Sequence, residues 1–76
     1  MQVSELHVGQ TAKILALGKG NLAYRQRLIA MGLIPGTDFT VSRIAPLGDP
    51  IEIHVRGFAL SLRKTEANIL QIEPVL

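Results

Sequence analysis

The sequence predicts a mostly β fold: a small SH3-like barrel of about five strands, formed by residues 1–76 as a single domain. Three observations predict it. Short apolar–polar alternations fill the second half, most clearly at Ile51, Ile53 and Val55. Glycines and prolines separate these segments as turn signals. The chain has 76 residues and no cysteine, so its strands must curl to protect their edges without disulfide support. An OB-like barrel is the alternative, although it typically places its helix later in the chain.

The first strand is expected at Thr11–Leu17. Alternate residues of this strand face the core in this interpretation: Ala12, Ile14 and Ala16. Leu15 and Leu17 lie on the other side and weaken the alternation. A strand with apolar residues on both sides indicates that both of its faces are covered.

One short α-helix is expected at Leu22–Met31, between the first two strands. Asn21 is a suitable N-cap, because its side chain can accept hydrogen bonds from the first N–H groups of the helix. Gly32 stands where a left-handed C-cap belongs. Pro35 and Gly36 follow as a turn signal, so the helix cannot continue.

From Thr37 to Ala45 the chain is rich in strand-forming residues, and a second strand is expected there. Two further strands are expected on either side of a tight reversal at Gly57. In the first, Ile51, Ile53 and Val55 alternate with Glu52, His54 and Arg56. In the second, Phe58, Leu60 and Leu62 alternate with Ala59, Ser61 and Arg63. Pairing across Gly57 would make Arg56 and Arg63 neighbours and give a small basic spot.

A helical turn is expected at Lys64–Asn68, before the last strand, with Thr65 as its cap. The closing strand is expected at Ile69–Glu73. Pro74 has no N–H to donate, so it is expected to end the ladder.

Charge and hydropathy exclude several classes of protein. Eight Lys and Arg residues against six Asp and Glu give a net charge of +2, without the dense basic patch of a dedicated nucleic-acid module. No apolar stretch approaches the roughly 20 residues that span a bilayer. The N-terminus lacks the basic start and apolar core of a signal peptide. We therefore expect a cytoplasmic protein.

The polar residues do not form a catalytic constellation, so we expect a binding module and not an enzyme. We expect no cofactor and no metal site. Glu52 and His54 share one strand face and could touch a metal ion, but two ligands do not make a selective site. Asp49 lies between Gly48 and Pro50, where its carboxylate is expected to serve a turn.

The expected helix carries two apolar rows. Tyr24, Leu28 and Met31 form the first row, Leu22 and Ile29 form the second, and Arg25 lies between them. Because a helix that covers a barrel needs only one apolar stripe, two interpretations stay open. The helix is wedged between the barrel and loops, or one of its rows is exposed for a partner.

Three segments together resemble the bacterial ferrous-iron transport protein A (FeoA) family: Tyr24–Leu28, Met31–Gly36 and Arg43–Ile51. In the second and third, the sequences are Met-Gly-Leu-Ile-Pro-Gly and Arg-Ile-Ala-Pro-Leu-Gly-Asp-Pro-Ile. The pairs Arg56-Gly57 and Glu66-Ala67 and the segment Leu60–Arg63 also match the family pattern. The resemblance covers essentially the whole chain.

The resemblance implies an SH3-like barrel, in agreement with the strand pattern. It also implies a cytoplasmic accessory protein of ferrous-iron uptake. Its expected partner is the membrane permease ferrous iron transport protein B (FeoB), which has a cytoplasmic GTP-binding domain. Two surfaces compete as the contact: the helix, through Tyr24, Arg25, Leu28 and Met31, and the rigid turn region, through Arg43, Pro46, Leu47 and Asp49. A nucleic-acid-binding barrel and a metal-sensing module are the alternative functions.

Overall fold

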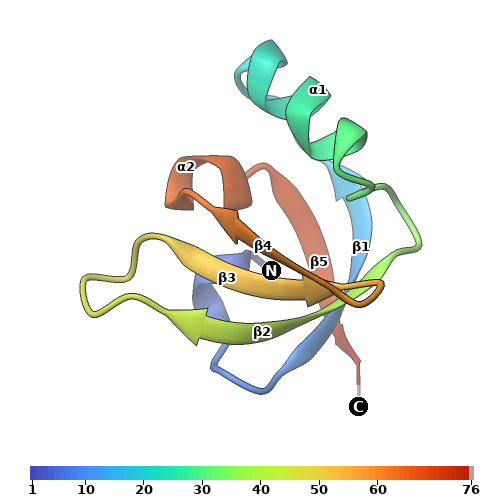
Figure 1. The fold of residues 1–76 in the computed structure, drawn as a ribbon. Helices are drawn as coiled ribbons and strands as arrows, with labels where there is room; N and C mark the ends of the chain where they lie inside the picture. Colours follow the sequence, from blue (N-terminus) through green and yellow to red (C-terminus); the bar gives the residue numbers. More distant parts are fainter. Residues whose placement is uncertain (76) are drawn as a thin grey trace.

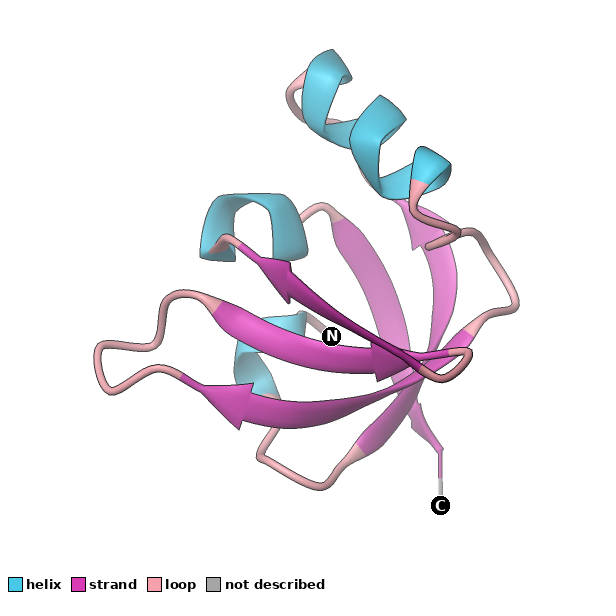
Figure 2. Ribbon diagram, in the orientation of Figure 1, coloured by secondary structure: helices cyan, strands magenta, loops and turns pink. Residues whose placement is uncertain are grey.

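The computed structural model describes residues 1–75 as one five-stranded antiparallel sheet that curls around a core (Figures 1 and 2). The strand order across the sheet is β4-β3-β2-β1-β5. In chain order, the elements are η1 (Val3–Glu5), β1 (Thr11–Leu17), α1 (Leu22–Ala30), β2 (Asp38–Ile44), β3 (Ile51–Val55), β4 (Phe58–Leu62), α2 (Lys64–Ala67) and β5 (Leu70–Val75). The predicted five strands, the helix after the first strand and the helical turn before the last are all confirmed.

The core lies inside the curled sheet. Within residues 1–75, sixteen buried apolar residues form one cluster. Most come from the strands, and Val3 of η1, Leu6 and Ala67 of α2 join them. Burying an aliphatic side chain of this kind stabilises the fold by about 1.5–3 kcal/mol. Such packing is the main support of this chain, because it has no cysteine.

The helix α1 begins and ends where the sequence predicts, within one residue. The Asn21 side chain accepts hydrogen bonds from the N–H groups of Ala23 and Tyr24, at 2.9 and 3.3 Å. At the other end Gly32 has a φ of +88°, and its N–H donates to the carbonyl of Ile29. The Leu33 N–H donates to the carbonyl of Leu28, and both of these side chains are buried. This is a Schellman C-cap with its apolar contact.

The expectation that β1 is covered on both faces is wrong at Leu15, which is 49% exposed. The pairing register between β1 and β5 shifts between Ile14 and Ala16, which marks a β-bulge. The extra residue reverses the alternation after Ile14. Ile14 therefore lies in the core and Leu17 packs against it, whereas Ala16, which was expected to face the core, is not part of it. Leu15 and Leu17 therefore lie on different faces of β1, because the bulge changes the alternation between them.

Two expectations about the C-terminal third are corrected. The N-cap of α2 is Arg63 and not Thr65, and the carboxylate of Glu66 accepts the Arg63 N–H at 3.1 Å. Pro74 lies inside β5, paired with Ala12, and does not end the ladder. The Ile72 N–H points away from β1 and donates to Met1. Because strand geometry repeats every two residues, the Pro74 nitrogen points the same way, where β1 needs no donor.

Candidate functional site

The two apolar rows of α1 have different environments. Leu28 is fully buried, and Tyr24 and Met31 pack against the core cluster beside it. Leu22 and Ile29, on the other row, are 64% and 47% exposed. The helix is therefore anchored by the Tyr24 row, and the Leu22 row is exposed. The use of an exposed row by a partner, which the second interpretation adds, stays a prediction.

This placement corrects one of the predicted contact residues. Leu28 cannot meet a partner in this conformation, because none of its surface is exposed. A Leu28→Gln substitution would bury an amide and damage the fold, so it cannot report on partner binding. Ile29, on the outer row of α1, is exposed and does not belong to the buried core. Arg25 is half-buried beside the inner row, and its role in binding stays a prediction.

A second anchor of α1 is electrostatic. The Glu66 side chain of α2 is 1% exposed, and its Oε2 lies 3.2 Å from Nη1 of Arg27. Its Oε1 accepts the Arg63 N–H. One buried carboxylate thus joins both helices and the start of α2. The ion pair links α1 to α2, although Glu66 Oε2 forms no hydrogen bond with the described residues and the Arg27 side chain is 57% exposed.

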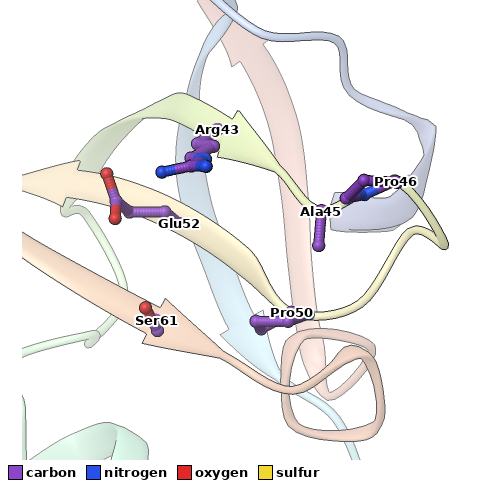
Figure 3. Close-up of a pocket in the computed structure, with 6 residues that line it drawn as sticks. All are labelled: Arg43, Ala45, Pro46, Pro50, Glu52 and Ser61. Carbon is purple, nitrogen blue, oxygen red and sulfur yellow. The ribbon is translucent and has the colours of Figure 1, made fainter.

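Three residues of the other predicted contact group lie in the loop between β2 and β3: Pro46, Leu47 and Asp49. The fourth, Arg43, lies near the end of β2, and Figure 3 shows it with Pro46. Leu47, at the tip of the loop, is 96% exposed, the largest exposure among the large apolar side chains described. The Gly48 N–H donates to the Ala45 carbonyl at 2.7 Å, which closes a turn. Asp49 Oδ1 accepts the Lys64 N–H at 3.1 Å, so this carboxylate holds the loop against α2. The sequence predicted a turn role for Asp49 but not this link.

A polar row crosses the outer face of the sheet next to this loop. The strand registers align Arg43 with Glu52 and Glu52 with Ser61. These three residues line a hollow of about 230 Å³ together with Ala45, Pro46 and Pro50 (Figure 3). The Ser42 hydroxyl donates to a carboxylate oxygen of Glu52 at 3.1 Å. The row presents one positive side chain, one negative side chain and a hydroxyl, and Arg43 and Glu52 form no ion pair within 4 Å.

A third surface was missed by the sequence interpretation. Phe58 was expected to lie on the same strand face as Leu60 and Leu62, yet it is 70% exposed. It lines an open groove of about 310 Å³ between the C-terminal end of α1 and the β3–β4 hairpin. The other lining residues are Ala30, Met31, Gly32, Val55, Arg56 and Leu60. The alternation of β4 identified the correct face of the strand, but nothing covers that face at Phe58 among the described residues.

Arg56 forms one end of this groove. It has a φ of +51° and forms the two-residue turn of the β3–β4 hairpin together with Gly57. Its Nη2 donates to the Thr37 hydroxyl at 3.4 Å, beside the C-cap of α1. The expected basic spot of Arg56 and Arg63 is wrong, because the register places them at opposite ends of β4. Within residues 1–75, the ion pair of Arg27 and Glu66 is the one found within 4 Å, and Arg56 forms none.

Residues 1–75 contain no cluster of three or more His, Cys, Asp and Glu side chains that could hold a metal ion. Glu52 and His54 lie on the outer face of β3, and the Glu52 carboxylate is engaged by Ser42. In the same part of the chain, no helix is long and apolar enough to cross a membrane.

Comparison with known proteins identifies relatives of this architecture. The family model described as the FeoA domain matches residues 1–74. The Fe(2+) transport protein A/Fe(2+) transporter FeoB fusion protein of Porphyromonas gingivalis is 36% identical over 73 residues. That match covers 96% of this chain but 8% of the relative, so the chain corresponds to a small part of the fusion protein.

Solved structures agree in fold. The solution structure of FeoA from Chlorobium tepidum is 37% identical, with a TM-score of 0.90, and the match covers 100% of this chain and 71% of that one. The crystal structure of Stenotrophomonas maltophilia FeoA complexed with zinc is 25% identical, with a TM-score of 0.83, over 96% of this chain and 89% of that one. It is described as an SH3 domain protein, which confirms the predicted SH3-like fold.

Proposed function

This chain belongs to the FeoA family, which is associated with ferrous-iron transport, and we propose that it regulates Fe²⁺ uptake by binding the cytoplasmic part of FeoB. The observation that carries this proposal is the relative in which a FeoA part and FeoB form one polypeptide. Covalent linkage keeps two modules at a high effective concentration. Linkage of this kind is useful to modules that work in contact with each other.

The surface supports a role in binding and not in catalysis. Its prominent features are exposed apolar side chains, among them Leu22 and Phe58. Exposed apolar groups of this size favour protein contacts, since they gain free energy when a partner removes them from water. Function in small barrels of this kind generally resides in loops, edges and grooves. We therefore propose a cytoplasmic, non-enzymatic accessory protein.

The experiment is a binding measurement between the purified chain and full-length FeoB from the same organism, reconstituted in lipid nanodiscs. It is carried out without nucleotide, with GDP and with a non-hydrolysable GTP analogue. We expect saturable binding in at least one nucleotide state. Absence of binding in all three states would contradict the proposal. Duplex DNA is the control ligand, and steep salt-dependent binding to it would favour a nucleic-acid-binding barrel instead.

A further inference from the structure

The strand β4 forms one edge of the sheet. It pairs with β3 on one side, and within residues 1–75 no strand pairs with its other side. The hairpin has a two-residue turn, so Val55 and Phe58, which flank the turn, exchange the first pair of ladder hydrogen bonds. The bonding positions of β4 then repeat every two residues. The backbone N–H and C=O groups of Ala59 and Ser61 consequently point outward from the sheet.

Several features that usually protect an edge strand are missing from β4. Its sequence, Phe-Ala-Leu-Ser-Leu, contains no charged residue and no proline, and its register with β3 continues without a bulge. Natural proteins use such devices to prevent unwanted strand pairing. An edge without them can accept another strand.

The open groove lies directly beside this edge. Phe58 and Leu60 belong to β4, and Met31 from the end of α1 forms the opposite wall. A strand added to β4 would present alternate side chains to this groove. Those side chains must be apolar to match Phe58, Leu60 and Met31. The remaining side chains would lie on the outer face, next to the polar row that ends at Ser61.

Cations flank β4 at both ends. Arg56 precedes the strand and forms no ion pair within 4 Å among the described residues, although Asp38 lines a neighbouring hollow with it. Arg63 and Lys64 follow the strand and are exposed. A second copy of the chain, paired antiparallel, would place Arg56 near Arg63 and Lys64 at both ends of the new pair. Like charges repel there, whereas acidic residues on a different chain would be attracted.

We propose that an extended segment of FeoB adds as a strand to the β4 edge. The segment has apolar side chains at alternate positions, which fill the groove beside Phe58, and acidic residues near its ends, which face Arg56 and Arg63. Backbone hydrogen bonds to Ala59 and Ser61 supply affinity, and the groove supplies selectivity. This inference rests on the proposed function, because it names FeoB as the source of the strand.

The test compares two pairs of variants in the nanodisc binding measurement. Ser61→Pro removes the outward N–H and keeps the bonds to β3, and Ser61→Ala is its matched control. We expect Ser61→Pro to weaken binding by about tenfold and Ser61→Ala to change it less than about twofold. Phe58→Ala is expected to weaken binding by about tenfold as well. Its matched control is Leu47→Ala, which shortens a still more exposed side chain on the rival loop and is expected to have little effect.

The possible results separate the two proposals. If the wild-type chain does not bind FeoB, the proposed function and this inference both fail. If it binds and the Ser61→Pro and Phe58→Ala variants bind equally well, only the added strand is overturned. Loss of binding in Leu47→Ala alone would place the contact on the β2–β3 loop. Wild-type dimers in sedimentation velocity that Ser61→Pro dissociates would identify a second copy as the occupant and overturn the assignment to FeoB.

Discussion

The two edge strands of the sheet are β4 and β5 (Figure 1). They differ in whether the outward backbone groups are hydrogen-bonded or blocked. On β5, the Ile72 N–H is bound by the carbonyl of Met1 at 3.3 Å, and Pro74 has no N–H at all. On β4, Ala59 and Ser61 carry outward N–H groups with no such cover among the described residues. The outer side of β5 is therefore blocked by a hydrogen bond and a proline, whereas the outer side of β4 can still form hydrogen bonds with another strand.

The neighbourhoods of the two edges also differ. Beside β4 lies the groove that contains Phe58, and α1 forms its second wall. Edge protection is the rule in small β proteins because open edges aggregate. An unprotected edge beside an apolar groove is better explained by a role in binding than by a lack of function. Of the two edges, β4 is therefore the one at which another chain can pair with this barrel.

The largest effect is expected from Leu60→Pro. The bonds of Leu60 are directed to β3, so proline there removes a ladder bond and an apolar side chain. We expect a loss of about 3 kcal/mol or more, which approaches the whole stability of a chain this small. Ser61→Pro should cost less than about 1 kcal/mol. Urea unfolding of the two variants measures both values, and equal losses would contradict the assigned register.

A smaller effect is expected from Glu66→Gln, which tests whether α1 is held as a wall of the groove. Glutamine keeps an oxygen for the Arg63 N–H but removes the charge that Arg27 faces. Because the Arg27 side chain is 57% exposed, the ion pair is largely screened, and we expect a loss of about 1 kcal/mol.

Arg25→Gln is the matched control for this change, since Arg25 forms no ion pair within 4 Å among the described residues. Urea unfolding compares the two variants. A Glu66→Gln protein as stable as Arg25→Gln would show that the carboxylate does not hold α1.

The smallest effect is expected from Pro74→Val, which gives β5 an outward N–H. The unfolded chain gains freedom when proline is removed, so we expect a loss of less than about 1 kcal/mol in urea unfolding. Binding to FeoB should not change. Weaker binding by this variant would shift the contact to β5 and break the comparison between the two edges.

Much of the fold could be predicted from local sequence. Asn21 and Gly32 each carry a conformational requirement of their own, and both ends of α1 were found to within one residue. The bulge in β1 was not found, since an extra residue at Leu15 looks like an ordinary two-sided strand until its partner strand is known. Pro74 was expected to end the ladder, and only the pairing of β5 with β1 shows that it lies inside the strand.

The candidate site was harder to predict, because alternation identifies the face of a strand but not what covers it. Phe58 and Leu62 share one face, yet Leu62 is fully buried and Phe58 is 70% exposed. Leu28 was predicted to contact a partner and is instead fully buried. Helical spacing identified the row of Leu28 but not which of the two rows packs on the barrel. Burial of this kind is decided by the positions of α1 and α2. The chain as a whole sets those positions.

The most direct test of the open edge is amide hydrogen exchange, residue by residue, in the chain alone and in its complex with FeoB. In the chain alone, the Ala59 and Ser61 amides should exchange rapidly, because their N–H groups point to solvent. In the complex, we predict that both amides exchange at least about tenfold more slowly, while Leu47 and Gly48 are unchanged. Protection at Leu47 and Gly48, with Ala59 and Ser61 still exchanging rapidly, would contradict strand addition at β4.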